Sequence, residues 1–301
     1  MIITRYKNSL LIVPAVISLV AVLALLIWGL HAGIDLKGGS LLQVSYPTGK
    51  PQIEQVQSAV AGLHLGDVRI QPTGESGYII RARNLNNDEK NALENSLNSL
   101  GTIHEDQFNS VGPVIGAELL RKGLIALALV AVSIILFIAF AFRKVSKPVA
   151  SWKYGIIAIV TLIHDILIPT GLFAFLGHFK GSEIDSLFIV ALLTLLGVSI
   201  NNTIVVFDRI RENLKRNEEY RKKEAFEETV GRSIMQTLAR SMNTSLTVII
   251  VLVALYILGP VATRDFSLTL IVGMIAGTYS SIFLASPLLV QWEKWQGTPK
   301  K

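Results

Sequence analysis

Long uncharged stretches alternate with short basic ones along most of the chain. The clearest of them is SLFIVALLTLLGVSINNTIVVF at Ser186 to Phe207, which contains no charged residue. At a rise of 1.5 Å per residue this stretch would extend roughly 33 Å, enough to cross the hydrocarbon core of a bilayer. Apolar stretches of similar length recur, and together they predict six membrane-spanning helices, at about 9–30, 123–142, 154–176, 186–207, 241–259 and 266–290.

The first apolar stretch also has features of a signal peptide, because Arg5 and Lys7 precede it. We interpret it as an uncleaved first span, since it is longer than a usual signal core and no small-x-small cleavage site follows Trp28.

The segment 31–122 is polar and has a different pattern, with 8 Lys or Arg and 10 Asp or Glu residues. Apolar and polar residues alternate in GSLLQVSYP, DVRIQPT, GYIIRARN and TIHEDQFNSVGP, as in strands, whereas PQIEQVQSAVAGL and NNDEKNALENSLNSLG have helical spacing. The predicted order is strand, helix, strand, strand, helix, strand, which is the ferredoxin-like α+β arrangement.

Basic residues concentrate in alternate connections, which predicts the orientation of the spans. The connections 143–153 and 208–240 and the tail 291–301 are basic, whereas the two short connections on the other side contain one basic residue each, Lys180 and Arg264. We therefore expect both termini and the 208–240 loop to be cytoplasmic and the 31–122 domain to be extracytoplasmic. Within the loop, Glu218 to Leu238 predicts an amphipathic helix lying on anionic lipid, or else a solvated connector.

Composition narrows the functional classes. Hydrophobic residues make up 51% of the chain and the mean hydropathy is +0.51, values that are rare for soluble domains. The chain contains no cysteine, and its 5 histidines form no HExxH pair, so we expect no metal centre, no cofactor and no enzymatic activity. The net charge of +6 is interpreted as a sign of membrane topology, and we expect no nucleic-acid partner.

Few polar groups interrupt the spans, and because a polar group is costly to place in a membrane, each of them is expected to have a structural or functional role. Asp165 lies beside His164 near the middle of the third predicted span, and Arg240 lies at the start of the fifth. The fourth span contains Asn201 and Asn202 and ends at Asp208. Interhelical hydrogen bonding is the alternative to a functional role, and we favour it for serine and threonine. For Asp165 and Arg240 we predict a shared hydrophilic seam that carries protons or ions.

Helical spacing assigns these polar groups to faces. Thr194, Asn201 and Asp208 recur every seven residues, with Ser199 and Asn202 on the adjoining strip. In the sixth span, small residues repeat every four positions, which predicts close helix packing; they are Thr269, Gly273, Gly277, Ser281 and Ala285. Pro169 and Pro287 predict kinks.

Several motifs resemble the SecF family, whose members work with SecD beside the Sec export channel. GVSINNTIVVFDRIREN resembles the signature of that family's fourth span, HDILI its third, and SIMQTLARSMNTSLT the arginine stretch of its fifth. GIDLKGGS is similar to the family's motif at the entry to the outer domain, with Gly33, Asp35, Gly38 and Gly39. The family's intramembrane aspartate, however, is replaced by Asn202 in this chain, and an amide cannot titrate.

The resemblance implies a subunit of the RND superfamily fold in the bacterial inner membrane. It would use the proton-motive force with a SecD-like subunit to assist late steps of protein export through SecYEG. Implied partners are a YajC-like small subunit, exported unfolded polypeptide and membrane lipid. The alternatives are an RND-like exporter of small molecules or ions, and a passive scaffold uncoupled from proton flow by Asn202.

Overall fold

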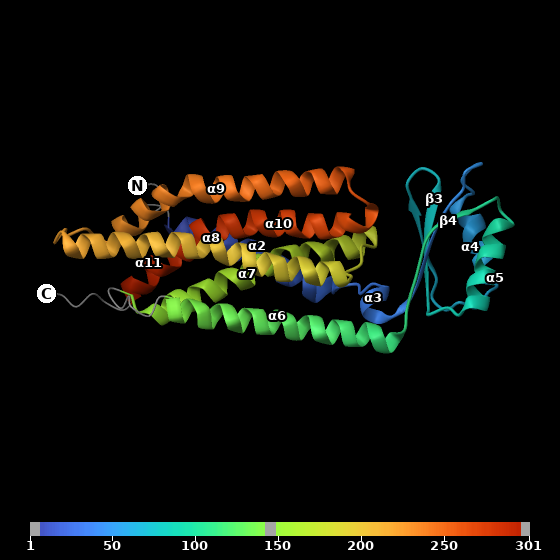
Figure 1. The fold of residues 1–301 in the computed structure, drawn as a ribbon, viewed down its shortest axis with the longest axis horizontal. Coiled ribbons are helices and arrows are strands. Elements are labelled where there is room, and N and C mark those ends of the chain that lie inside the picture. The colour runs from blue at the N-terminus through green and yellow to red at the C-terminus, as the bar shows by residue number, and fades with distance from the viewer. Residues whose placement is uncertain (1–6, 142–148, 296–301) are drawn as a thin grey trace. The chain divides into compact units, whose positions relative to one another are not determined.

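The computed structural model describes residues 7–141 and 149–295, and the chain divides into two compact units. One unit is helical and comprises Met1–His31, Ile125–Glu183 and Leu187–Lys301. The other comprises Ala32–Leu124 and Ile184–Ser186 and contains a sheet with helices on one of its faces (Figure 1).

A four-stranded antiparallel sheet forms the smaller unit, with the strands in the order β2-β3-β1-β4. Both of its longer helices, α4 and α5, cover the same face (Figure 1). Along the chain the order is strand, helix, strand, strand, helix, strand, as expected from the sequence, and a one-turn helix precedes the first strand. The elements are α3 (Ile34–Lys37), β1 (Gly39–Ser45), α4 (Ile53–Ala61), β2 (Arg69–Thr73), β3 (Gly77–Ala82), α5 (Asn87–Asn98) and β4 (His104–Val111).

The core of this unit lies between the sheet and its two helices. Val44 and Tyr46, in and just after β1, are completely buried, as are Val56 of α4 and Leu97 of α5. Alternation in β1 produces this arrangement, because every second side chain of a strand points to the same face.

Six helices in the described residues are long and apolar enough to cross a membrane, which confirms the number expected from the sequence. The last of these six consists of four shorter pieces in series. The helices are α2 (Lys7–Trp28), α6 (Pro113–Ala141), α7 (Ser151–Lys180), α8 (Ser186–Glu219), α9 (Phe226–Leu258), and then the 3-10 turn η1 (Val261–Thr263), α10 (Arg264–Ser280), the π-helical turn η2 (Ser281–Ala285) and α11 (Ser286–Trp295).

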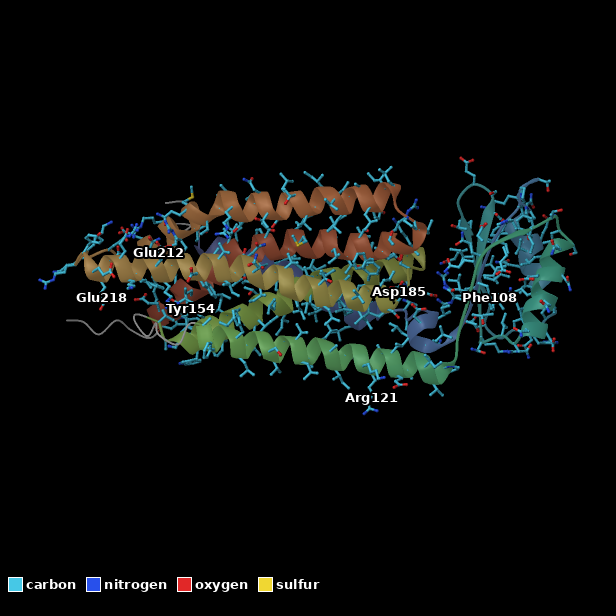
Figure 2. The ribbon with its side chains drawn as sticks, viewed as in Figure 1. Phe108, Arg121, Tyr154, Asp185, Glu212 and Glu218 are labelled. Carbon is cyan, nitrogen blue, oxygen red and sulfur yellow. The ribbon has the colours of Figure 1, made fainter. Side chains whose placement is uncertain are left out.

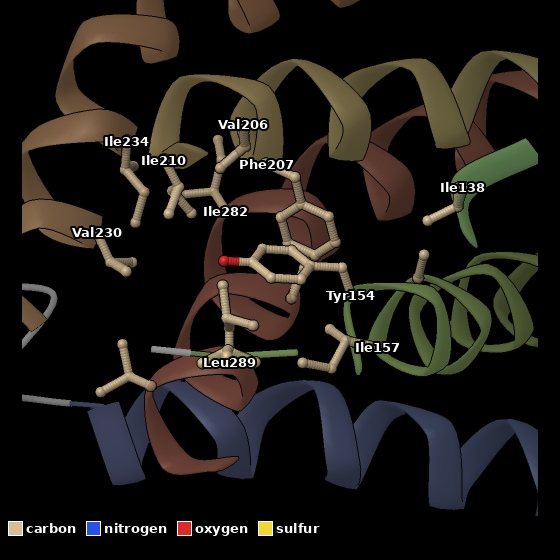
Figure 3. Packing of buried hydrophobic residues seen from close by; sticks show 14 of the residues in the cluster. Ile138, Tyr154, Ile157, Val206, Phe207, Ile210, Val230, Ile234, Ile282 and Leu289 are labelled. Carbon is tan, nitrogen blue, oxygen red and sulfur yellow. The ribbon is translucent and has the colours of Figure 1, made fainter. Parts of the chain in front are cut away.

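The spans differ strongly in how much of their surface this chain covers. Only 6% of the apolar stretch of α6 is buried, whereas 67% of the last span is buried. Around the centre of one core cluster, the Tyr154 ring packs edge-on against Phe207, with ring centroids 5.2 Å apart, close to Ile282 and Leu289 (Figure 3). The final span is therefore central to the bundle, and α6 is peripheral.

The segment Glu218 to Leu238 does not form a separate surface helix, so that prediction is wrong. Its first residues belong to the charged end of α8, where Glu212 and Glu218 are seen (Figure 2), and its remainder begins α9. The start of α9 packs on α8: Val230 and Ile234 lie in the same apolar cluster as Ile210, and Asn213 Nδ2 donates to Ser233 Oγ at 2.8 Å. Amphipathic spacing cannot distinguish a helix that covers lipid from one that covers another helix.

The repeat of small residues in the last span is a packing surface, as predicted. A Cβ atom added to Gly273 would lie 2.3 Å from Leu195 Cδ2, so α8 and α10 approach closely at this point. Pro169 lies inside the continuous helix α7. Pro287 follows directly after the π-helical turn η2 and one α-helical residue.

Candidate functional site

A carboxylate is buried inside the helical unit. Asp165 of α7 is 0% exposed, and its Oδ2 accepts a hydrogen bond from the Ser199 hydroxyl of α8. The Ser280 hydroxyl of α10 contributes a second interaction. The other oxygen, Oδ1, has no hydrogen-bond partner among the described residues. Three spans thus meet at one acidic group that is shielded from the surroundings.

Gly277 of α10 makes this meeting point possible. A Cβ atom at that position would lie 2.8 Å from Ser199 Oγ and 3.4 Å from Asp165 Oδ2. Because glycine has no Cβ, α10 can approach α7 and α8 closely enough for the hydroxyl and carboxylate to meet.

An amide lies one turn further along α8. Asn202 Nδ2 donates to Ser245 Oγ of α9 at 3.3 Å, and Thr278 Oγ1 of α10 donates to the same oxygen at 2.6 Å. Asn202 is buried, so its polar group is satisfied by other helices, as the sequence predicts. Together with Asp165, Ser199 and Ser280, these residues form what we call the buried polar network.

His164 faces another helix. Its Nδ1 lies 2.7 Å from Ser18 Oγ of α2, and its Nε2 has no hydrogen-bond partner among the described residues. Thr161, about one turn earlier on α7, is also buried, but its hydroxyl donates to the backbone of its own helix, to Ala158 O at 2.8 Å. Thr161 therefore does not extend the network.

The predicted single seam is divided in the structure. Asn201, Asp208 and Arg240 are exposed, and none of their side chains has a hydrogen bond or ion pair with another residue in 7–141 or 149–295. Arg209 Nε donates to Gln236 Oε1 at 2.7 Å, which joins the outer faces of α8 and α9 near these residues. We call Asn201, Asp208 and Arg240, with Asn243 and Thr247, the exposed polar face.

The glycine motif of the smaller unit is a turn. Gly38 and Gly39 have φ angles of 84° and 141°, and a Cβ at Gly38 would lie 2.5 Å from Pro113 Cα. Gly33 donates its backbone N–H to Ile184 O at 2.8 Å. Asp35 accepts the Ser186 backbone N–H at 3.5 Å, and between Asp35 and Lys37, both in the described part, no ion pair forms. The motif thus fixes the backbone where this unit begins and ends.

Sequence reasoning missed four members of these contacts, Ser18, Ser245, Thr278 and Ser280. Each is a small hydroxyl residue in an apolar helix, and such residues usually bond to their own backbone, so the sequence alone does not distinguish them. Among the described residues, no group of three or more His, Cys, Asp or Glu side chains could hold a metal ion.

Comparisons with known proteins give consistent matches. A family model described as protein export membrane protein SecD/SecF, C-terminal, matches residues 92–295. Protein translocase subunit SecF of Thermobaculum terrenum is 43% identical over 305 residues, covering 97% of this chain and 93% of that protein. The SecF subunit of Synechocystis is 33% identical, with 98% and 95% covered.

A solved structure has the same fold. The crystal structure of SecDF, a translocon-associated membrane protein from Thermus thermophilus, matches with a TM-score of 0.85 and 29% sequence identity. The match covers 98% of this chain, and this chain spans 39% of the length of that SecDF chain.

Proposed function

The chain belongs to the SecD/SecF family of protein export membrane proteins, and from that premise we propose that it uses the proton-motive force, together with a SecD-like subunit, to assist protein export. Family membership supports an accessory role in Sec translocation and a multi-pass location in the inner membrane. The SecYEG channel, a YajC-like subunit and the exported unfolded chain are further partners in this proposal. The role requires no enzymatic chemistry.

The observation that carries the proton step is the buried carboxyl group of Asp165. A proton carrier has to gain and lose a proton, which a carboxyl group can do and the amide of Asn202 cannot. Asp165 is fully buried and connected to α8 and α10 through hydroxyl groups, so a change in its charge would alter contacts between three spans. We propose Asp165 as this chain's titrating group, and a carboxylate of the SecD-like subunit as the alternative.

A substitution experiment distinguishes the two. Asp165→Asn keeps the shape and removes the titration, and Glu218→Gln does the same at an exposed position at the charged end of α8. We expect the first to reduce proton-driven export in inverted or reconstituted vesicles by tenfold or more, and the second to leave it near wild type. If Asp165→Asn left export unchanged while the complex stayed intact, the proton transfer would belong to the SecD-like subunit.

The exposed polar face is the proposed contact with that subunit. Arg240 and Asp208 are charged side chains on spanning helices, and charges in a membrane are costly unless a partner or water meets them. A related helical bundle covering α8 and α9 would supply such partners. Arg240→Ala should therefore weaken copurification with the SecD-like subunit, and Lys180→Ala is the matched control.

We further propose that 31–122 is a ferredoxin-like extracytoplasmic domain and that both termini are cytoplasmic. The strand order β2-β3-β1-β4 with two helices on one face supports the first part, and the basic connections support the second. Because the chain has no cysteine, single cysteines can report the sidedness directly. A membrane-impermeant maleimide added to intact cells should label Glu75→Cys and not Arg221→Cys.

A passive scaffold is the second candidate, and Asn202 is the observation that favours it. Under that function, Asp165→Asn and Arg240→Ala would both leave export intact while assembly still depended on the last two spans. Asn202→Asp separates the hypotheses further, because a restored carboxyl group should raise force-dependent export only if the position takes part in coupling.

A further inference from the structure

A buried lysine without a carboxylate partner lies at the start of α7. Lys153 is 8% exposed, although a lysine ammonium is strongly hydrated in water. Its Nζ lies 5.3 Å from the centroid of the Trp152 ring and 5.7 Å from that of Trp292 in α11. Within 7–141 and 149–295, no Asp or Glu side chain forms an ion pair with it.

The remaining parts of the sequence provide no acidic side chain either. Residues 1–6, 142–148 and 296–301 read MIITRY, FRKVSKP and QGTPKK, without Asp or Glu. Between 143 and 153 the chain has 4 basic residues and no acidic one. Among the described residues, therefore, no carboxylate side chain neutralises Lys153, and the sequence of the other segments contains none.

Ring contacts alone do not replace a counter-ion. A cation–π contact stabilises less than the desolvation of an ammonium group costs, so a buried lysine usually has an anionic partner. The backbone at this point also favours a bound anion. Lys153 lies in the first turn of a 30-residue helix whose N-cap, Ala150, makes no side-chain cap hydrogen bond. The Lys153 backbone N–H donates to Ala150 O at 3.0 Å, and the helix dipole attracts negative charge at such an end.

We propose that Lys153, at the positive end of the α7 dipole, binds the phosphate of an anionic phospholipid beside the edge-to-face pair of Trp152 and Trp292, whose ring centroids are 5.8 Å apart. The lipid source follows from the position. The candidate span begins at Trp152, and Trp152 is 55% exposed. Tryptophan at the end of a spanning helix lies at the depth of the headgroups, where phosphate is concentrated. Assignment to the inner leaflet rests on the orientation proposed above, whereas binding itself does not.

Native mass spectrometry of the full-length chain with phosphatidylglycerol or phosphatidylcholine tests the proposal. The variant is Lys153→Met, and Lys180→Met at the opposite end of the same helix is the control. We expect phosphatidylglycerol to bind wild type and Lys180→Met equally and Lys153→Met about fivefold more weakly, which corresponds to ~1 kcal/mol. Lys153→Arg, which retains the charge, should keep the preference for phosphatidylglycerol.

Two results would overturn the assignment. Equal weakening by Lys153→Met and Lys180→Met would show a general charge effect without a site. If inorganic phosphate competed as well as the lipid at equal concentration, the site would be one for a soluble anion. Lipid binding is measured without export, so loss of either property with the other intact separates this proposal from the proposed function.

Discussion

Substitution of Gly277 by alanine tests whether close packing holds the buried polar network together. The added Cβ would lie 3.1 Å from Ser199 Cβ and 2.8 Å from its Oγ. Carbon atoms pack at about 3.5–4.0 Å, so α8 and α10 would have to separate by about 0.4–0.9 Å at this point. Ser199 Cβ is fixed to the backbone, and rotation of its hydroxyl away from the clash would break the bond to Asp165.

The expected cost has two opposing parts. Overpacking costs about 1–3 kcal/mol, whereas replacing a helical glycine by alanine regains about 1 kcal/mol, so a net loss of ~0–2 kcal/mol is expected. Gly197→Ala on α8 is the control, because a Cβ there would meet nothing within 4 Å. This variant should therefore show only the stabilisation from replacing a helical glycine by alanine.

Both variants would be reconstituted with the SecD-like subunit and measured for thermal unfolding midpoint and for proton-driven export. We expect Gly277→Ala to unfold at a lower temperature than Gly197→Ala and to lose most of its export activity. A Gly277→Ala protein that matched Gly197→Ala in both measurements would refute the role of this contact.

Two further predictions concern regions outside the network. Hydrogen bonding and charge from Arg83 lower the pKa of Glu89 below its ordinary 4.5, so this pair stabilises α5 above that pH and the contribution is lost as pH falls through the lowered value. The protection factors of the α5 amides, which are corrected for the slower intrinsic exchange in acid, should therefore fall in acid in the wild type, and in Glu89→Gln they should already be low at neutral pH. Asn213→Ala should destabilise the contact between α8 and α9 by about 1–3 kcal/mol, since Ser233 and Gln236 lose a buried donor. Faster proteolysis of the connecting turn would reveal this loss, and unchanged cleavage would contradict it.

Much of the fold follows from local patterns. Uncharged stretches of about 20 residues predict membrane-spanning helices, because they match the thickness of the hydrocarbon core. Alternation in GSLLQVS predicts which face of β1 is buried. The order of helices and strands in the smaller unit can be predicted for the same reason, because it follows from local patterns of apolar and polar residues. The single mistake about an element, a separate helix at Glu218 to Leu238, arose because amphipathic spacing does not name the surface that is covered.

The site was only partly accessible. Helical spacing placed Asn202 and Ser199 on one strip and Asn201 and Asp208 on another, and the structure keeps that distinction. Spacing could not show that one strip points inward and the other outward, because this depends on which helices are neighbours. Nor could it select Ser245 among the many serines of the spans.

The π-helical turn η2 interposes one extra residue between two stretches of ordinary helix in the final span. Ser280, next to Asp165, lies just before the turn, and Trp292, beside Lys153, lies after it. If the turn returned to ordinary helical spacing, everything beyond it would rotate by about 100° relative to α10. Such a change would turn Trp292 away from Trp152 and Lys153 of α7, while Ser280 and Asp165, which lie before the turn or on another helix, would keep their positions. The π-helical turn therefore allows the end of the last span to rotate independently of the buried carboxyl group.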